Sequence, residues 1–404
     1  MRTNYPTSTP SAIPLIGSTA AGRMLSAIRT DGPMTRSDAT AAASLARSAA
    51  GKAVDDLQRL ALLRAGSTVG DGTPGRPSAT LEIVDSGAVV IACVLGSNGL
   101  DLAVMDLART IKLRRFESFN ATGMDPFETL ATIAKTINEV HGALGPKCVG
   151  IGISVPGVFD PHAGIARAVL PLGWRNIPMA AVLEQWLPAN VPTLIAHDAT
   201  LGALAEFRMG AGRGAQRLLY LAGQQIGVGS ALILADGQTG RSDQPLQAGH
   251  LIVDPLGPKC SCGSRGCLEL LVDGRALVAA MGEVASAPFS LRAALDALSR
   301  DTPLPAAMDR IVGHLQVGLI SLVNTLSPDR VVLAGTLSPL MSRFEERMND
   351  ALDISVVAQI QPVTLVGSTF DDAQIFGAAE IAFEPLLRDP EGLFEQVSRG
   401  TADC

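Results

Sequence analysis

The stretch His250-Leu-Ile-Val-Asp-Pro-Leu-Gly-Pro-Lys-Cys-Ser-Cys-Gly-Ser-Arg-Gly-Cys-Leu-Glu269 gathers one imidazole and three thiols in a single glycine-rich loop. Imidazole nitrogens and thiolates are the ligands of closed tetrahedral zinc sites. Gly263 and Gly266 allow the loop to turn back, so that a late cysteine can reach the same ion as two early ones. The segment therefore predicts a structural zinc ion bound by His250, Cys260, Cys262 and Cys267.

The alternative for these cysteines is a set of buried free thiols, which pack as small hydrophobic side chains. The whole chain has only 6 Cys and 5 His, so the meeting of four ligands in one loop favours the metal. The other three cysteines, Cys93, Cys148 and Cys404, stand apart in the sequence and predict no disulfide framework.

At 404 residues the chain is long enough for two or three domains, each with its own core. A hydrophobic content of 47% with 18% charged residues is typical of folded rather than disordered proteins. The sequence contains no uninterrupted apolar run long enough to span a membrane, and its first residues lack the pattern of a signal peptide. We therefore expect a cytoplasmic protein without a membrane partner.

The net charge of −7 is unevenly distributed. Residues 1–80 contain nine Arg or Lys against five Asp, a net charge of +4, which leaves −11 for residues 81–404. A basic segment on an acidic remainder is the distribution expected when only that segment approaches a polyanion such as DNA. Charges that only solvate a surface give a similar pattern, so the charge supports DNA binding without deciding it.

The first eighty residues have the pattern of a winged helix-turn-helix. Apolar spacing and helix breakers predict three helices, over residues 18–29, 39–43 and 46–60, followed by a Gly/Pro/Ser-rich run and a strand that begins near Ala79. In such modules the third helix lies in the major groove, and the hairpin wing touches the DNA backbone or the minor groove. The predicted DNA contacts are Arg47, Ser48 and Lys52 on the third helix and Arg76 in the wing.

A helical cap or a dimerisation module is the alternative for this segment. Its third helix is rich in alanine and offers few groups for reading bases. The order of the helices and the basic charge favour DNA binding, whereas the alanine content speaks against extensive base reading.

From about residue 80 onward, strands alternate with helices. Apolar runs predict strands over residues 80–85, 89–95, 148–154, 193–196, 218–221, 229–235 and 330–333. Helical spacing predicts helices over residues 126–144, 199–210 and 306–326 and a final helix from Ile375. Two successive sets of strand, turn and helix units predict two α/β lobes, with a ligand-binding cleft at the carboxyl ends of their strands.

The order of five motifs points to a known family. They are Gly75-Arg76-Pro77, Val155-Pro156-Gly157, Gly173-Trp174, Asp198 at the start of a helix that reaches Glu206, and the His250–Glu269 loop. Over nearly its whole length the chain resembles the ROK family of repressors and sugar kinases, most of all the repressor branch, which includes xylose and N-acetylglucosamine repressors.

This resemblance implies an α/β fold in which a winged helix-turn-helix precedes a two-lobed, actin-like (ribonuclease H-like) domain. It also implies a structural zinc, a sugar-type pocket and homodimers or homotetramers. On this basis the DNA-binding domain covers residues 1–80, the first lobe residues 81–198 and the second lobe residues 199–404, with the last helix packed back on the first lobe.

The phosphate-binding turns of the family's sugar kinases are altered here. Those kinases usually carry Asp-x-Gly-Gly-Thr after the first strand, and we assign Asp85-Ser86-Gly87-Ala88-Val89 to that turn. Their second turn, Gly-Thr-Gly-Ile-Gly-Gly-Gly, corresponds to Gly223-Gln-Gln-Ile-Gly-Val-Gly229, in which three positions have gained bulk. The third turn, Ala334-Gly335-Thr336, keeps one of two usual glycines. Asp198 matches the family's general base, which is vestigial without a place for the transferred phosphate.

The resemblance also places an effector site on particular residues. The predicted contacts are Gly157, Asp198, Gln247, His250 and Glu269. His250 would bind zinc through one ring nitrogen and a sugar hydroxyl through the other. Three usual family residues are replaced, a glutamate by Gln247 and two asparagines by His197 and Pro171. These changes are compatible with a modified or acidic sugar, with a different polyol, or with no ligand.

The leading interpretation is a transcriptional repressor without enzymatic activity, which binds operator DNA with its head and senses a sugar or sugar derivative with its lobes. The first alternative is a ROK sugar kinase that phosphorylates a hexose-type sugar with ATP and carries an N-terminal extension. Val89, Gln224, Gln225 and Val228 argue against it. The second alternative is a scaffold protein whose third helix has lost DNA reading.

Overall fold

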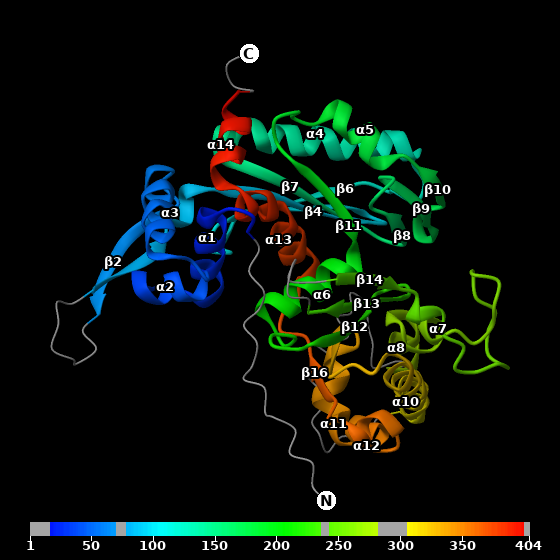
Figure 1. The fold of residues 1–404 in the computed structure, drawn as a ribbon. Helices are drawn as coiled ribbons and strands as arrows, with labels where there is room; N and C mark the ends of the chain where they lie inside the picture. Colours follow the sequence, from blue (N-terminus) through cyan, green and yellow to red (C-terminus); the bar gives the residue numbers. More distant parts are fainter. Residues whose placement is uncertain (1–16, 70–77, 236–241, 282–304, 400–404) are drawn as a thin grey trace, which may run out of the picture. The chain divides into compact units, whose positions relative to one another are not determined.

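The computed structural model describes residues 17–69, 78–235, 242–281 and 305–399 (Figure 1). The chain divides into two compact units. Among the described residues, 17–205 and 372–399 form the first, which we call the head-bearing unit. Glu206–Asp371 form the second, which we call the metal-loop unit because it contains the His250–Glu269 loop. Helix α6 (Asp198–Met209) runs across the boundary between the two units.

The N-terminal head consists of three helices and a small sheet. Its elements are α1 (Ala20–Asp31), β1 (Met34–Thr35), α2 (Arg36–Ala42), α3 (Arg47–Arg59), β2 (Leu63–Val69) and β3 (Ser78–Ile83). Thr19 and Thr35 cap α1 and α2, because each side chain accepts a hydrogen bond from a backbone N–H of the first turn. The strands form one sheet in the order β1-β3-β2. The predicted winged helix-turn-helix is confirmed.

The head shares its hydrophobic core with the rest of the head-bearing unit. Met24, Leu25 and Ile28 of α1 are almost fully buried and belong to the same cluster as side chains of α3. That cluster also includes Leu386 and Leu387 near the end of α13 (Ala373–Arg388). Apolar burial therefore joins the head to α13 of the same unit.

A five-stranded sheet forms the centre of the head-bearing unit. Its strands are β4 (Val89–Gly96), β5 (Gly99–Asp106), β6 (Ile111–Ser118), β7 (Cys148–Val155) and β11 (Thr193–His197). The order is β11-β7-β4-β5-β6, in which β4, β5 and β6 are antiparallel neighbours, β7 runs parallel to β4, and β11 runs parallel to β7. A smaller sheet contains β8 (Val158–Asp160), β9 (Ile165–Val169) and β10 (Trp174–Ile177).

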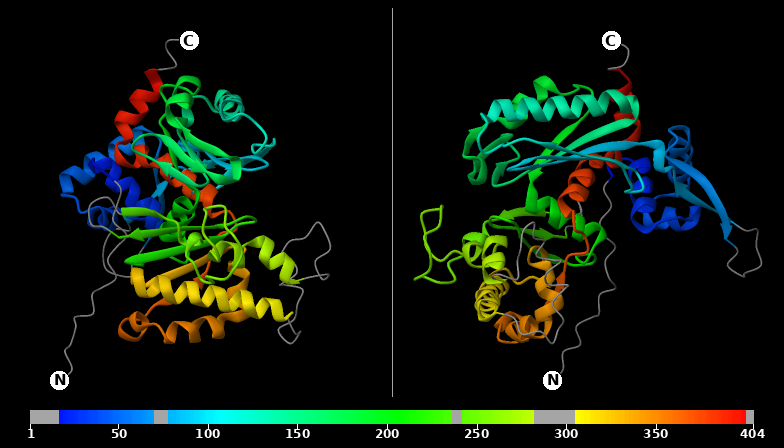
Figure 2. Two further views of the ribbon diagram at one scale, coloured as in Figure 1. Left: turned by 90° about the vertical axis from the view of Figure 1, so that its right-hand side faces the viewer. Right: turned by 180° about the vertical axis from the view of Figure 1, so that it is seen from behind.

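Helices cover both faces of the large sheet (Figures 1 and 2). Helices α4 (Pro126–Leu144) and α5 (Met179–Trp186) lie on one face, and α13 lies on the other. Two glycines of β7 permit a close approach of α13, because a β-carbon at Gly150 or Gly152 would lie 2.1 or 1.9 Å from a carbonyl oxygen of that helix. A further helix that the sequence did not predict, α14 (Pro390–Arg399), follows α13.

The metal-loop unit contains a second five-stranded sheet with the same plan. Its strands are β12 (Arg217–Gly223), β13 (Val228–Leu234), β14 (Ser242–Leu246), β15 (Arg330–Gly335) and β16 (Thr364–Gly367). The order is β14-β13-β12-β15-β16, with three antiparallel strands followed by two parallel ones. This order recurs in both units, as the actin-like plan requires. The predicted fold class is confirmed.

The helices of the metal-loop unit pack on this second sheet. They are α7 (Leu268–Val272), α8 (Gly274–Met281), α10 (Ala306–Leu326), α11 (Ser338–Asp353) and α12 (Val356–Ile360). Helix α10 is long and apolar enough to cross a membrane by length and composition. Its side chains Leu315, Leu319 and Val323 are fully buried in the same core as the strands, so packing inside this unit accounts for its apolar face.

Candidate functional site

The metal loop is folded back on itself by its two predicted turn glycines. Gly263 and Gly266 adopt φ values of +96° and +60°, a region that glycine tolerates best. A β-carbon at Gly266 would lie 1.5 Å from the carbonyl oxygen of Asp254, so this position requires glycine. The backbone of Cys260 donates to the carbonyl of Ser264 at 2.8 Å and closes the turn. Cys267 then stands at the N-cap of α7, a fixed position for a ligand.

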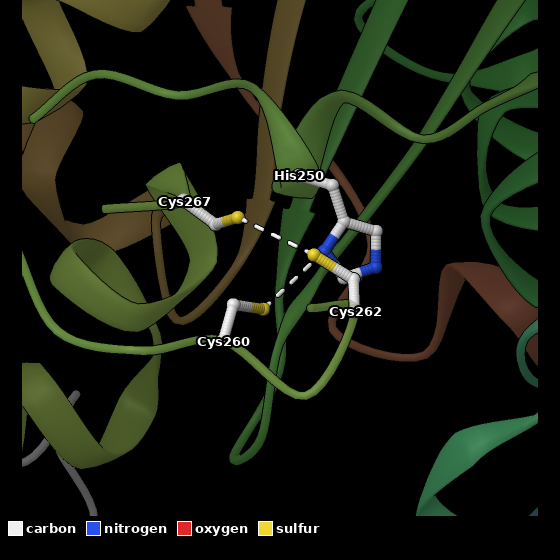
Figure 3. A group of neighbouring side chains, drawn as sticks. All are labelled: His250, Cys260, Cys262 and Cys267. Atoms are coloured by element: carbon white, nitrogen blue, oxygen red, sulfur yellow. Dashed lines mark hydrogen bonds between the residues drawn. The ribbon is translucent and has the colours of Figure 1, made fainter. Parts of the chain in front are cut away.

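The four predicted ligands converge on one point (Figure 3). Their nitrogen and sulfur atoms all lie within 4.8 Å of one another. His250 Nδ1 lies 3.6 Å from Cys260 Sγ, and Cys262 Sγ lies 3.7 Å from Cys267 Sγ. Ligands of a tetrahedral zinc ion, at about 2.3 Å for sulfur and about 2.0 Å for nitrogen, are separated by about 3.5–3.8 Å. The cluster therefore has the size of a metal site.

The thiols of the cluster differ in their protonation. Burial raises the pKa of Cys260 and raises the pKa of Cys267 to about 12. A hydrogen bond with the backbone of Ser264 lowers the pKa of Cys262, the exposed member of the group. Three adjacent thiols do not all ionise without a cation, because each thiolate opposes the next. A bound metal would supply that charge.

Glu269 lies directly beside the predicted metal ligands. Its Oε1 atom is 3.1 Å from Cys260 Sγ, which donates to it, and 3.3 Å from His250 Nδ1. The carboxylate therefore contacts two of the four ligands, as outer-sphere groups of metal sites do. Gln247, the third predicted effector residue of this unit, is exposed and immediately precedes a short turn that ends at His250.

In the head-bearing unit, the other two predicted effector residues follow neighbouring strands. Gly157 follows β7 with a φ of +82°, and a β-carbon there would lie 2.3 Å from the carbonyl oxygen of Ala168. Asp198 follows β11 and begins α6. The five predicted effector contacts are thus divided between the two units, and their meeting in one pocket stays a prediction.

Asp198 is held by the residue before it. His197 Nε2 lies 3.1 Å from Asp198 Oδ1, and both side chains are more than nine-tenths buried. The hydroxyl of Thr200 lies 3.5 Å from the other ring nitrogen of His197. The histidine that replaces a usual family asparagine therefore orients the aspartate.

The assignment of the first phosphate turn to Asp85–Val89 is wrong. Strand β3, which precedes this segment, pairs with β1 and β2 in the head and is no part of the lobe sheet. The first strand of the lobe is β4, and Asp85–Gly87 form a short 3-10 turn before it begins. The turn after this first strand is Gly96-Ser-Asn-Gly99, between β4 and β5.

The β4–β5 turn also departs from the kinase pattern. The residues that lead into the β4–β5 turn are Val94-Leu-Gly-Ser-Asn98, where the kinase pattern reads Asp-x-Gly-Gly-Thr. Valine stands in place of the aspartate, and a carboxylate is missing where the kinases carry one. The other two turns lie together, because the backbone N–H of Thr336 donates to the carbonyl of Gly223 at 2.9 Å.

The predicted DNA contacts on α3 are exposed. Arg47 begins the helix, and Ser48 and Lys52 are also accessible to solvent. Arg76 lies outside the described residues. The sequence did not single out Arg36, an exposed cation at the start of α2 that donates to the carbonyl of Gly51 at 3.3 Å. Its position directly after the helix cap Thr35 was the available signal.

The chain has a winged helix-turn-helix head followed by two ribonuclease H-like sheets. This arrangement defines an actin-like α/β protein with a head of the DNA-binding type. Residues 90–384 match the ROK family, and the chain belongs to that family. The resemblance stated from the sequence motifs is confirmed.

Similar proteins include repressors and kinases. The putative xylose repressor of Caldicellulosiruptor sp. (strain Rt8B.4) is 24% identical over 342 residues, 80% of this chain and 85% of that protein. The DNA-binding transcriptional repressor Mlc of Escherichia coli (strain K12) is 26% identical over 403 residues, 94% of this chain and 95% of that protein. The glucokinase of Thermotoga maritima is 29% identical over 282 residues, 64% of this chain and 86% of that enzyme.

The fold has a solved counterpart. The crystal structure of a ROK family transcriptional regulator, a homologue of the E. coli Mlc protein, is similar with a TM-score of 0.71 and 22% identity. The similarity covers 93% of this chain and 98% of that one, so it includes the head as well as both lobes.

Proposed function

We propose that this ROK family protein is a transcriptional repressor that binds operator DNA through its head. The observation that carries the proposal is the winged helix-turn-helix itself, with Arg47, Ser48 and Lys52 exposed on α3. The E. coli repressor Mlc matches 94% of this chain, so the match extends into the head, whereas the T. maritima glucokinase covers 64% of it. A head of this kind has no part in phosphoryl transfer.

The metal loop holds zinc in this proposal. Three thiols and one imidazole are a ligand set that zinc prefers, and their separations fit one tetrahedral ion. All four positions are filled by protein side chains, as in structural sites, so the ion would stabilise the loop rather than activate water.

The effector of the repressor is a sugar or a sugar derivative. This part of the proposal rests on family membership, on the names of the xylose repressor relatives and on the buried carboxylate of Asp198. His197 restrains that carboxylate, so the site is built around an oriented acceptor for a hydroxyl group. Effector binding would act by favouring one of two states of the protein that it binds unequally.

Sugar phosphorylation is the second candidate, because kinases are among the relatives and Asp198 begins α6 as the family's general base does. Val94 opposes it, since it removes the carboxylate of the first phosphate turn. Gln224, Gln225 and Val228 oppose it as well, since they add bulk to the second turn. We therefore propose that phosphoryl transfer is lost.

From family membership we propose a homodimer or homotetramer in the cytoplasm. Two heads related by a two-fold axis read two half-sites that lie about 34–36 Å apart, or multiples of that distance.

A gel shift on the DNA upstream of the chain's own gene tests the proposal. The wild-type protein is expected to retard this duplex at low salt, and Lys52→Ala is expected to weaken the complex. Lys135→Ala, which removes one exposed lysine from α4, is the matched control and is expected to bind as the wild type does. Absence of a shift at low salt, with or without added cell extract, would leave the scaffold interpretation in place.

An ATPase assay tests the second candidate. Purified protein incubated with ATP and a panel of hexoses is expected to show no sugar-dependent turnover. Turnover that disappears in Asp198→Asn would establish a kinase instead.

A further inference from the structure

The turn between β12 and β13 is contacted by a carboxylate from another part of the metal-loop unit. Asp273, the residue between α7 and α8, is 1% exposed. Its Oδ2 atom accepts a hydrogen bond from the backbone N–H of Gly227 at 3.1 Å. Gly227 belongs to the segment that corresponds to the second phosphate turn of the family's kinases. A backbone N–H of this turn is therefore directed at an anion from within the same unit.

Asp273 also caps α8, but this role does not explain its contact with Gly227. As a helix cap, Asp273 uses Oδ1, which accepts from the backbone N–H of Ala276 at 3.0 Å. Its other oxygen, Oδ2, faces Gly227 and also accepts from Arg275, at 3.0 Å from Nε and 2.7 Å from a terminal nitrogen. The arginine neutralises the carboxylate and leaves it as a stable, fixed acceptor.

The backbone around Asp273 is fitted to the same turn. The N–H of Gly274 donates to the carbonyl of Gln224 at 2.8 Å. A β-carbon at Gly274 would lie 3.0 Å from that carbonyl oxygen and 3.0 Å from Gln225 Cα, closer than most side chains tolerate. The N–H of Gln224 in turn donates to the carbonyl of Gly227 at 3.0 Å. The residues between α7 and α8 thus pack directly against the β12–β13 turn.

The metal loop and the turn are linked through α7. Cys267, a predicted zinc ligand, occupies the N-cap position of this helix, and Glu269 in its first turn contacts the ligand cluster. A β-carbon at Gly227 would lie 3.2 Å from Glu269 Oε2. Glu269 and Asp273, one helical turn apart, therefore both border Gly227.

We infer that Asp273 is a built-in anion that occupies the β12–β13 turn and excludes phosphate-bearing ligands such as nucleotides from it. Backbone N–H groups in a glycine-rich turn attract anions, and here the protein supplies one permanently. A second anion at Gly227 would find the backbone N–H already hydrogen-bonded to the Asp273 carboxylate. The inference rests on the proposed loss of phosphoryl transfer and assigns one residue a specific part in it.

Rescue by added anions tests this inference on the full-length protein. Asp273→Ala is expected to lower the thermal midpoint, because it vacates the acceptor of Gly227 and the cap of α8. Sodium formate or sodium phosphate is then expected to restore part of the loss, more than sodium chloride of equal ionic strength does. The response of the wild type gives the general effect of each salt, because phosphate stabilises folded proteins by exclusion from their surface, and the specific recovery is the excess of the variant's response over it.

The matched control is Asp254→Ala, which removes a different carboxylate that accepts a backbone hydrogen bond, from Leu256, in the neighbouring metal loop. It is expected to show no recovery specific to formate or phosphate. Equal effects of all three salts on Asp273→Ala, or the same recovery in both variants, would overturn the inference.

Asp273→Asn provides a second measurement if the alanine variant does not fold. The amide keeps the shape and an acceptor for Gly227 but removes the charge. Phosphate is therefore expected to stabilise this variant more than the wild type, and an equal effect on both would contradict the inference. Calorimetric binding of Mg-ADP by the wild type would also contradict it. Gel shifts with the same variants keep the two proposals separate, because operator DNA binding does not depend on the β12–β13 turn.

Discussion

Arg29 of α1 and Glu380 of α13 form a buried ion pair that fixes the head to the body of its unit. Two guanidinium nitrogens of Arg29 lie 3.1 and 2.6 Å from the two carboxylate oxygens, and the side chains are 2% and 1% exposed. Arg109 approaches the same carboxylate at 3.1 Å and donates to the backbone carbonyl of Arg29. Arg29 also lies over the ring of Phe383 at 4.6 Å. Helix α1, which shares its hydrophobic core with α3, is thus fixed to α13.

Replacement of Glu380 by glutamine is expected to destabilise the whole head-bearing unit. The amide keeps the size of the side chain but removes the negative charge beside Arg29 and Arg109. Of these two arginines, Arg29 is buried. Loss of one partner of a buried pair typically costs about 3–5 kcal/mol. Urea unfolding followed by circular dichroism measures the change in the free energy of unfolding.

The control for this variant is Glu139→Gln, which breaks the ion pair of Glu139 with Arg115 on the surface of α4. Exposed pairs contribute little, so this variant is expected to unfold almost as the wild type does. Equal stabilities of the Glu380 and Glu139 variants would show that the buried pair does not secure the head.

Metal removal is expected to unfold the His250–Glu269 loop. We expect one zinc ion per chain by elemental analysis, and a lower thermal midpoint after treatment with a chelator. Cys262→Ser should retain less zinc and respond less to the chelator, because a hydroxyl is a poor zinc ligand. Cys404→Ser, a cysteine distant in sequence from the cluster, is the control and should retain its metal. A full complement of zinc in Cys262→Ser would remove this cysteine from the ligand set.

Sequence reasoning succeeded where the decisive contacts are local. The four predicted metal ligands fall in one loop whose glycines allow it to turn back, so spacing alone was sufficient to predict that they converge. The helices of the head and α10 follow from apolar periodicity and caps within a single segment. The effector residues are different, since they come from two units and their prediction depended on the family resemblance.

Sequence reasoning failed where the pairing partner is remote. The apolar run near residue 80 looks like the first strand of a lobe, but its partners β1 and β2 place it in the head, and the phosphate turn was misassigned as a result. The pair of Arg29 with Glu380 joins residues 351 positions apart and has no signature in either helix. Asp273 reads as an ordinary helix cap until the position of Gly227 is known.

Acidification is expected to destabilise the head-bearing unit through His141, in the last turn of α4. Partial burial lowers the pKa of this imidazole below its ordinary value, because the charged form loses hydration. The unfolded chain therefore binds the proton more readily than the folded chain. The resulting contribution to stability is present above the ordinary pKa of 6.5 and is lost as the pH falls below it.

The measurement is the free energy of unfolding of the wild type and of His141→Gln between neutral pH and pH values below 6.5. The variant is expected to lose less stability over this interval, because it has no imidazole to protonate in the unfolded state. His162→Gln, at an exposed loop position, is the control. Identical pH dependence of the wild type and His141→Gln would refute the prediction.

Salt dependence is expected to report the phosphate contacts of the head. Each Lys or Arg that neutralises one phosphate contributes about one unit to the slope of log affinity against log salt. Arg36→Ala and Lys52→Ala are each expected to lower the slope by about one unit, whereas Lys135→Ala leaves it unchanged. Fluorescence anisotropy with the upstream duplex at several salt concentrations measures the slopes. A slope unaffected by either substitution would place the DNA elsewhere on the molecule.

The packing of α13 on β7 is expected to be intolerant of a single methyl group. A β-carbon at Gly152 would lie 1.9 Å from the carbonyl oxygen of Ala378, which belongs to a helix backbone and cannot rotate away. Gly152→Ala must therefore displace α13, and overpacking of this kind costs about 1–3 kcal/mol or more. Because α13 also carries Glu380, the displacement should strain the ion pair with Arg29 and weaken DNA binding together with stability.

Gly142 in α4 provides the matched substitution, since nothing lies within 4 Å of a β-carbon there. Gly142→Ala is expected to stabilise the protein by about 0.5–1 kcal/mol through the lower flexibility of its unfolded state. The two variants make the same chemical change in one unit, so opposite signs in urea unfolding isolate the contact with α13. A stable Gly152→Ala with normal DNA affinity would show that the helix can move without disturbing the head.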